Sequence, residues 1–354
     1  MKFFLLIVLA YFSFNTLADM TYDNVGNMDM MSDMMANDSA NVADNIMAEE
    51  DGLVGSFALR YKALGFEEPA NPLSYRARLG WRGTVNDLVQ WNLVLSTNTE
   101  QAFGSIGLRD ISFEKAYISY APVEGLKFKV GKMGWLPDYH KAGVLVSEQL
   151  YIEGVNAKYT LHDGNTFGKV SVYRLVTEEG NKQGNDPLSD GITLKGKLGT
   201  MFNVSNFDSS IYVMGLYDGL LPEESNNEVN TLAQAGISVT SSEMPVPLGV
   251  FAHYMSDIET PGEFSYVAGV SVGHGISSEE GDFGLAVSYH QIDASDYRTS
   301  WLNEDYVNNA GSGVSARLQY NVWDQSNLVV KYAYNLDDNE GEPHNVVAEL
   351  TFLF

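Results

Sequence analysis

The chain of 354 residues contains no cysteine. A disulfide framework, a thiolate nucleophile, a zinc–thiolate site and an iron–sulfur cluster are therefore excluded. Basic residues are also scarce, because 21 Lys and Arg stand against 46 Asp and Glu, which gives a formal net charge of -25. Proteins that bind nucleic acid carry a basic footprint, so the charge argues against a nucleic-acid partner.

Long apolar runs are almost absent, and the one continuous example covers residues 3–14. Lys2 precedes this run, and Thr16 and Ala18 supply the small residues at positions -3 and -1 of a cleavage point before Asp19. The pattern is typical of a secretory signal peptide, and its core is shorter than the roughly 20 apolar residues that span a bilayer. We therefore predict an exported protein, in which any passage through a membrane would be made by strands.

The segment that follows, residues 19–50, contains seven methionines, eight acidic residues and no basic residue. Thioether ligands suit Cu(I), and the dense spacing of five of these methionines leaves soft-metal binding open. So polar a segment cannot bury a core of its own, which favours the alternative of a flexible acidic lead-in.

From residue 51 onward, apolar and polar residues alternate with a period of two, which predicts strands. Arg76, Arg78 and Arg82 fall on one face of such a strand, and Leu79 and Trp81 fall on the other. We expect sixteen strands and no long helix. The expected strand centres lie near residues 56, 79, 92, 116, 129, 155, 171, 195, 213, 235, 250, 269, 286, 316, 330 and 350.

The connections between these strands alternate between long and short. Such alternation is typical of transmembrane barrels, which have long outer loops and short periplasmic turns. We therefore predict an all-β fold for residues 51–354, namely one closed antiparallel transmembrane barrel of about sixteen strands with an aqueous lumen.

The last strand ends on Phe354, with Val346, Leu350 and Phe352 on the same face. Closing a barrel removes its edges, so this strand should pair with the first one, near residues 54–61. A terminal Phe on an alternating strand resembles the signal that the barrel assembly machinery reads. Phe354 is therefore our candidate assembly signal.

Residues 110–154 contain a set of short motifs. An Ala-Tyr strand, FEKAYISY at 113–120, leads by a short turn into Val-Gly-Lys at 130–132, and Glu-Gly follows at 153–154. In this respect the chain resembles the putative-porin family of Gram-negative outer membranes, and the sequence at 76–80 is similar as well. The resemblance implies a water-filled diffusion channel in the cell outer membrane.

In a barrel of this size, basic side chains opposite apolar faces should line the lumen. They are either a ladder that sets the electric field for solutes or simply a solvated wall. We expect replacement of Arg76 and Arg78 by Ser to shift selectivity toward cations and to leave the stability of the barrel nearly unchanged. The candidates are Arg76, Arg78, Arg82, Lys127, Lys129, Lys195, Lys197 and Arg317.

The two halves of the chain differ in charge. Residues 52–200 hold 17 basic and 15 acidic residues, whereas residues 201–354 hold 3 and 22. A basic wall and acidic loop mouths oppose each other, so the sign of any ion selectivity stays open.

The third long loop, residues 134–148, mixes aromatic, charged and apolar residues. In general porins the third loop folds into the lumen, and that resemblance makes four of its residues constriction candidates. An ordinary surface loop is the alternative, although three consecutive apolar residues at 144–146 favour folding inward. The candidates are Asp138, His140, Lys141 and Glu148.

No catalytic motif and no metal-ligand spacing of the six histidines occurs, so we expect neither an enzyme nor a cofactor. Acidic clusters in the late loops could hold Ca²⁺, but solvated loop tips are the simpler reading and the metal question stays open. The expected partners are outer-membrane lipid and lipopolysaccharide, the barrel assembly machinery and small hydrophilic solutes, with a homotrimer by analogy. A channel specific for anionic solutes and a structural or adhesive barrel are the alternative functions.

Overall fold

The computed structural model describes fourteen stretches of the chain. The predicted signal peptide, the Met-rich segment, the four constriction candidates and Phe354 lie outside them. The described stretches are residues 52–64, 73–97, 101–102, 111–134, 150–161, 164–177, 192–218, 230–241, 244–258, 264–273, 281–292, 311–323, 326–336 and 344–353.

Sixteen long strands and one strand of two residues make up the described part of the chain, and every expected strand centre falls inside a long strand. The strands are β1 (Gly52–Leu64), β2 (Leu73–Asn86), β3 (Val89–Thr97), β4 (Gln101–Ala102), β5 (Ile111–Val123), β6 (Leu126–Gly134), β7 (Leu150–Thr160), β8 (Thr166–Thr177), β9 (Thr193–Val204), β10 (Phe207–Asp218), β11 (Asn230–Ser241), β12 (Leu248–Asp257), β13 (Phe264–Gly273), β14 (Phe283–Ile292), β15 (Gly311–Trp323), β16 (Ser326–Asn335) and β17 (His344–Leu353).

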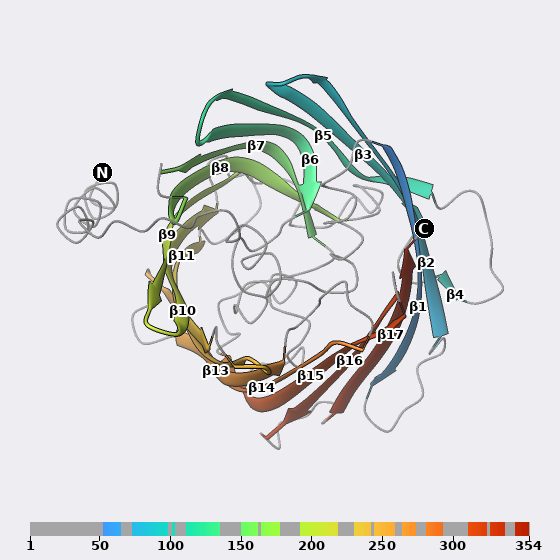
Figure 1. Ribbon diagram of the computed structural model, residues 1–354, viewed down its shortest axis with the longest axis vertical. Helices are drawn as coiled ribbons and strands as arrows, with labels where there is room; N and C mark the ends of the chain where they lie inside the picture. The colour runs from blue at the N-terminus through green and yellow to red at the C-terminus, as the bar shows by residue number, and fades with distance from the viewer. Residues whose placement is uncertain are drawn as a thin grey trace.

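The sixteen long strands form one closed antiparallel barrel, as the sequence predicts (Figure 1). Each long strand pairs with the next in chain order, and the short β4 pairs with β2 beyond the end of β3. The seam closes where β1 pairs with both β2 and β17, in a register that runs from Ser56 opposite Leu353 to Leu64 opposite Asn345. Within the described stretches, no helix is long and apolar enough to cross a membrane.

The connections between strands divide between the two ends of the barrel. One end carries two-residue turns such as those after β2, β5 and β9, and the other carries connections of up to eighteen residues, such as the one between β14 and β15. The alternation in length fails once, because the β12–β13 connection at the long end is shorter than the β13–β14 connection at the short end. The two ends of the barrel are therefore distinct.

Burial along the strands is the reverse of that in a soluble protein. On β12, Val250 and Tyr254 are exposed on the outer face, while the neighbouring His253 and Met255 are fully buried on the inner face. Many buried polar side chains and exposed large apolar side chains follow the same alternation around the barrel. An apolar outer band with a polar interior is the pattern of a barrel that sits in lipid.

The three motifs near residues 116–154 lie side by side on neighbouring strands. Tyr117 lies opposite Gly131, Gly131 opposite Gly154, and Gly154 opposite Tyr173. Gly131 has a φ of 129°, which a side chain rarely adopts, and a Cβ at Gly154 would meet the carbonyl oxygen of Val172 and lie 2.6 Å from the Cα of Tyr173. The glycines therefore allow the strands from β5 to β8 to approach one another closely beside Tyr117 and Tyr173.

We expect Gly154→Ala to lower the free energy of unfolding by about 1 to 3 kcal/mol, because the added Cβ meets backbone that cannot move aside. Gly168→Ala is the matched control, since its Cβ would lie 3.3 Å from the flexible end of Leu198 and should change stability little. Denaturant unfolding in detergent micelles measures both. Equal losses for the two variants would contradict this account of the glycine row.

Candidate functional site

The inner face of the barrel is the candidate functional site, and β2 shows how it is made. Arg76 and Arg78 are each only 7% exposed, whereas Leu79 and Trp81 are 45% and 56% exposed on the opposite face. Because side chains alternate along a strand, Arg82 shares the face of the other two arginines. The three arginines therefore point into the barrel.

A carboxylate that the sequence analysis did not single out lies between two of these arginines. The register between β3 and β5 shifts, so that Val94 lies opposite Lys115 while Leu95 lies opposite Phe113. Glu114 is thus the extra residue of a β-bulge. Both Glu114 and Lys115 are buried as a result, although neighbours in a regular strand would point to opposite faces.

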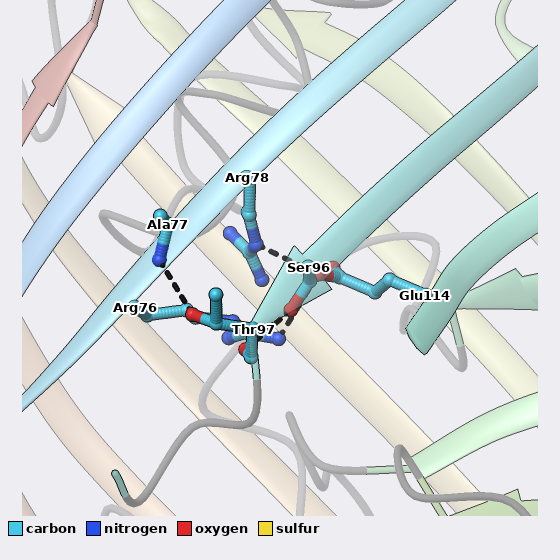
Figure 2. A network of polar contacts seen from close by, with 6 residues as sticks. All are labelled: Arg76, Ala77, Arg78, Ser96, Thr97 and Glu114. Carbon is cyan, nitrogen blue, oxygen red and sulfur yellow. Dashed lines mark hydrogen bonds and ion pairs between the residues drawn. The ribbon is translucent and has the colours of Figure 1, made fainter. Parts of the chain in front are cut away.

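Glu114 makes an ion pair with each arginine. Its Oε2 accepts a hydrogen bond of 2.9 Å from Nε of Arg78 and lies 3.2 Å from Nη2 of Arg76. Figure 2 shows the two guanidinium groups converging on the carboxylate across β3. Beside them, the hydroxyl of Thr97 accepts a hydrogen bond from the backbone N–H of Ala77, which ties β2 to the end of β3.

These ion pairs argue against the expectation that replacing Arg76 and Arg78 leaves stability unchanged. Two guanidinium groups surround one carboxylate that is 1% exposed, with Lys115 next to it in the chain, so the cluster keeps a net positive charge. Removing the partners of a buried charge costs about 3 to 5 kcal/mol, because that charge stays behind unpaired. Arg76 and Arg78 therefore stabilise the buried carboxylate of Glu114.

The other basic candidates also lie on the inner face. Nη2 of Arg82 donates a hydrogen bond of 2.9 Å to the side-chain oxygen of Gln90. On β6, Lys127 and Lys129 alternate with the outward Val130, and Lys127 is exposed.

Lys195 and Lys197 are buried on the inner face of β9. Arg317 lies on the inner face of β15, opposite Lys331 of β16. The structure thus brings the lysines and arginines of β2, β5, β6 and β9 to one wall and leaves Arg317 on the other.

Strands β10 to β12, which follow β9 around the barrel, carry a polar network that the sequence analysis did not single out. The hydroxyl of Tyr212 lies 2.8 Å from Nδ1 of His253 and accepts a hydrogen bond of 2.5 Å from the amide nitrogen of Gln234. These residues come from β10, β11 and β12, so their proximity depends on the register of the strands and on no local motif. Near the seam, Nε of Arg60 lies 2.6 Å from a carboxylate oxygen of Glu349.

The inner wall is not polar throughout. Near the end with the long connections lies a band of buried apolar side chains from β6 to β8 and from β10 to β14, which the sequence analysis did not anticipate. The band consists of Met133, Ile152, Tyr173, Leu216, Leu232, Met255, Val267 and Ile292.

Several Tyr and Trp rings are exposed on the outer face. These rings are Trp81, Tyr120, Tyr159, Tyr217, Tyr254, Tyr289, Tyr320 and Trp323.

The outer face also carries charged residues near the ends of β6, β7 and β8. Glu153 lies opposite both Lys132 and Arg174, and its carboxylate lies 2.6 Å from Nη2 of Arg174.

Metal binding finds no support among the described residues, which contain no group of three or more His, Asp or Glu side chains that could hold an ion. Most of the acidic loop clusters lie outside these residues, so metal binding by those clusters stays a hypothesis.

No protein-family model matches the sequence, and no curated protein matches it. Solved structures do match. OmpF of Salmonella typhi, in complex with daunomycin, has a TM-score of 0.54 at 12% identity, over 86% of this chain and 97% of that one. OmpT of Vibrio cholerae in its trimer form, an outer membrane protein, has a TM-score of 0.50 at 13% identity, over 86% and 98%.

At these identities the likeness shows a shared fold. The protein has the closed sixteen-stranded barrel architecture of these structures. The resemblance to putative porins is thus supported at the level of the fold, while no family model supports it at the level of sequence.

We expect the double variant Arg76→Ser/Arg78→Ser to lower the free energy of unfolding by about 3 kcal/mol or more, because Glu114 would stay buried without its partners. Adding Glu114→Gln should recover most of this loss, because the leftover charge is removed. Denaturant unfolding of the double, the single Glu114→Gln and the triple variants measures the coupling. If the losses in free energy of unfolding of the double variant and of Glu114→Gln add up to the loss of the triple variant, the ion pairs do not act as a unit.

Proposed function

We propose that the protein is an outer-membrane channel through which small hydrophilic solutes and ions diffuse passively along the barrel interior. The observation that carries this proposal is the inverted burial pattern, with exposed apolar side chains outside and charged side chains inside. A barrel that presents Leu79 and Trp81 outward has a surface suited to lipid, and one that turns Arg76 and Arg78 inward needs water or counter-charges there.

The outer face supports the membrane location. A charged side chain at the bilayer midplane costs about 2 to 4 kcal/mol, which gives the inward placement of the arginines a physical reason. Exposed Trp and Tyr rings suit the interface between lipid and water. Export by residues 1–18 and an assembly signal at Phe354 would deliver the chain to the outer membrane, with lipid and lipopolysaccharide around it.

The inner face supports a channel with a transverse electric field. Basic side chains gather on the wall from β1 to β9, whereas the described inner positions from β10 to β17 include Asp257 and Glu349 and few bases. Opposed charges across a narrow aqueous path guide anions and cations along different sides. Folding of residues 134–148 inward, which remains a proposal, would narrow that path.

The analogy with the similar structures extends to the oligomeric state. The similar OmpT structure is a trimer form, and we propose a homotrimer here also. The barrel itself closes within one chain, so each protomer would hold its own channel.

Planar-bilayer recording tests the function. The wild-type protein should give ohmic channels, and Arg76→Ser/Arg78→Ser should move the reversal potential under a KCl gradient toward cation selectivity, because two fixed positive charges leave the inner wall. Salt screens such charges, with a Debye length of about 10 Å at 0.1 M, so the shift should shrink as the salt concentration rises.

Two further variants make this test selective. The triple variant with Glu114→Gln should shift the potential in the same direction by a smaller amount, because one negative charge is also removed. Arg174→Ser changes an arginine on the outer face and should leave the reversal potential unchanged. Absence of channels in the wild type, or an equal shift in Arg174→Ser, would contradict the proposed function.

A further inference from the structure

Four lysines lie side by side across four neighbouring strands of the barrel. Lys127 of β6 lies opposite Lys158 of β7, and Lys158 lies opposite Lys169 of β8. Lys169 in turn lies opposite Lys197 of β9. We call these four residues the lysine row. Two of its members, Lys158 and Lys169, were not candidates from the sequence, and only the register of the strands shows that they belong to the row.

The lysine row belongs to the inner face. Tyr159 and Val170, which follow Lys158 and Lys169 in the chain, are exposed on the outer face. Leu194, which is also exposed there, is an odd number of residues from Lys197 on β9 and so faces the opposite way. The exposure of the row falls from β6 to β9, since Lys127 is exposed and Lys197 is 4% exposed. The row also rises into the barrel, from one residue after the start of β6 to seven residues before the end of β9 at Val204.

A second row runs directly beside the first. Lys129 lies opposite Asn156, Asn156 opposite Ser171, and Ser171 opposite Lys195. Asn156, Ser171 and Lys195 are buried on the inner face. The two rows together, which we call the lysine patch, place six ammonium groups, one amide and one hydroxyl on four adjacent strands.

The patch is costly for the fold. Directly opposed residues in an antiparallel sheet have Cα atoms about 4.5 to 5.5 Å apart, and like charges at that spacing destabilise the pairing. The row contains three such pairs in succession. A multiply charged anion that touches several of these lysines at once would offset part of the repulsion between them.

Aromatic rings hold three of the six ammonium groups in place. Nζ of Lys129 lies 5.1 Å from the centre of the Tyr117 ring, and Nζ of Lys158 lies 5.5 Å from that of Phe167. Nζ of Lys197 lies 4.3 Å from the centre of the Tyr212 ring. Cation–π contacts of this kind position a lysine while leaving its charge intact. The ammonium groups are therefore pre-arranged along the wall.

We propose that the lysine patch is a binding site for multiply charged oxyanions, of which an oligophosphate chain is the best match. A small single anion can contact the lysines of two adjacent strands, whereas a chain of linked phosphates can contact those of three or four. Charge-assisted hydrogen bonds from ammonium groups supply the affinity, and Asn156 and Ser171 add neutral donors. This site rests on the proposed function in that solutes reach it through the barrel interior.

The direct test is calorimetric titration of the detergent-solubilised protein with orthophosphate, pyrophosphate and tripolyphosphate at low salt. Affinity should increase with the number of linked phosphates, with tripolyphosphate bound at least about tenfold more tightly than orthophosphate, as expected when each added anionic group finds another lysine. Equal affinity for the three, or no binding, would overturn the site.

Charge-removing variants locate the site. Lys158→Gln/Lys169→Gln should weaken tripolyphosphate binding by about 10- to 100-fold, because two charge-assisted contacts are lost. Lys331→Gln is the matched control, since it removes a lysine from the inner face of β16 on the opposite wall. An equal loss in the control would show that only the general charge of the barrel matters, which would overturn the proposal.

Bilayer recordings with the same anions separate this site from the channel. A protein that conducts ions and binds the three phosphates equally would keep the proposed channel and overturn the lysine patch. A protein that binds tripolyphosphate with the expected variant pattern but passes no current would support the patch and overturn the channel.

Discussion

Backbone hydrogen bonding in lipid is the constraint on which the rest of the structure depends. Hydrocarbon offers no partner to a free N–H or C=O group, so a sheet can cross a membrane only if it has no edges. The pairing of β1 with β17 meets this condition, and it joins strands almost 300 residues apart in the chain. The ion pair between Arg60 and Glu349 spans the same seam on its inner side.

Closure gives every strand two different environments, and the burial pattern follows from it. Apolar residues such as Val250 and Val270 are exposed on the outer face because that face suits hydrocarbon, while hydroxyl, amide and charged groups turn inward. Gly131 and Gly154 allow close packing beside Tyr117 and Tyr173, and the pairing of β6 to β9 brings the lysine patch to the same wall. The distribution of charge inside the barrel is thus a consequence of strand register.

Much of the fold could be predicted from the sequence, because a period of two is a local signal that each strand carries by itself. The same signal placed Arg76 and Arg78 on one face. Glu114 was missed because a β-bulge interrupts the alternation there, and only the pairing of β5 with β3 reveals the extra residue. The sequence alone does not give the register of the strands, and it is this register that brings Glu114 close to the two arginines.

The lysine row and the network of Tyr212, Gln234 and His253 were missed for a related reason. Each member comes from a different strand, and whether two of them meet depends on where each connection starts and ends. A shift of one residue in any pairing would turn a lysine to the other face. The unpredicted apolar band on the inner wall likewise joins single residues from eight strands.

Spin labelling at adjacent positions tests the central claim, which is that the barrel sits in a membrane with its apolar face outward. The chain has no native cysteine, so single labels can be placed without background. Ala286 lies on the inner face of β14 and Val287 on the outer face. In liposomes, a label at Ala286→Cys should relax faster with a water-soluble paramagnetic reagent, and one at Val287→Cys with oxygen dissolved in the lipid. Equal access of the water-soluble reagent to both labels, or the reverse order, would contradict the account.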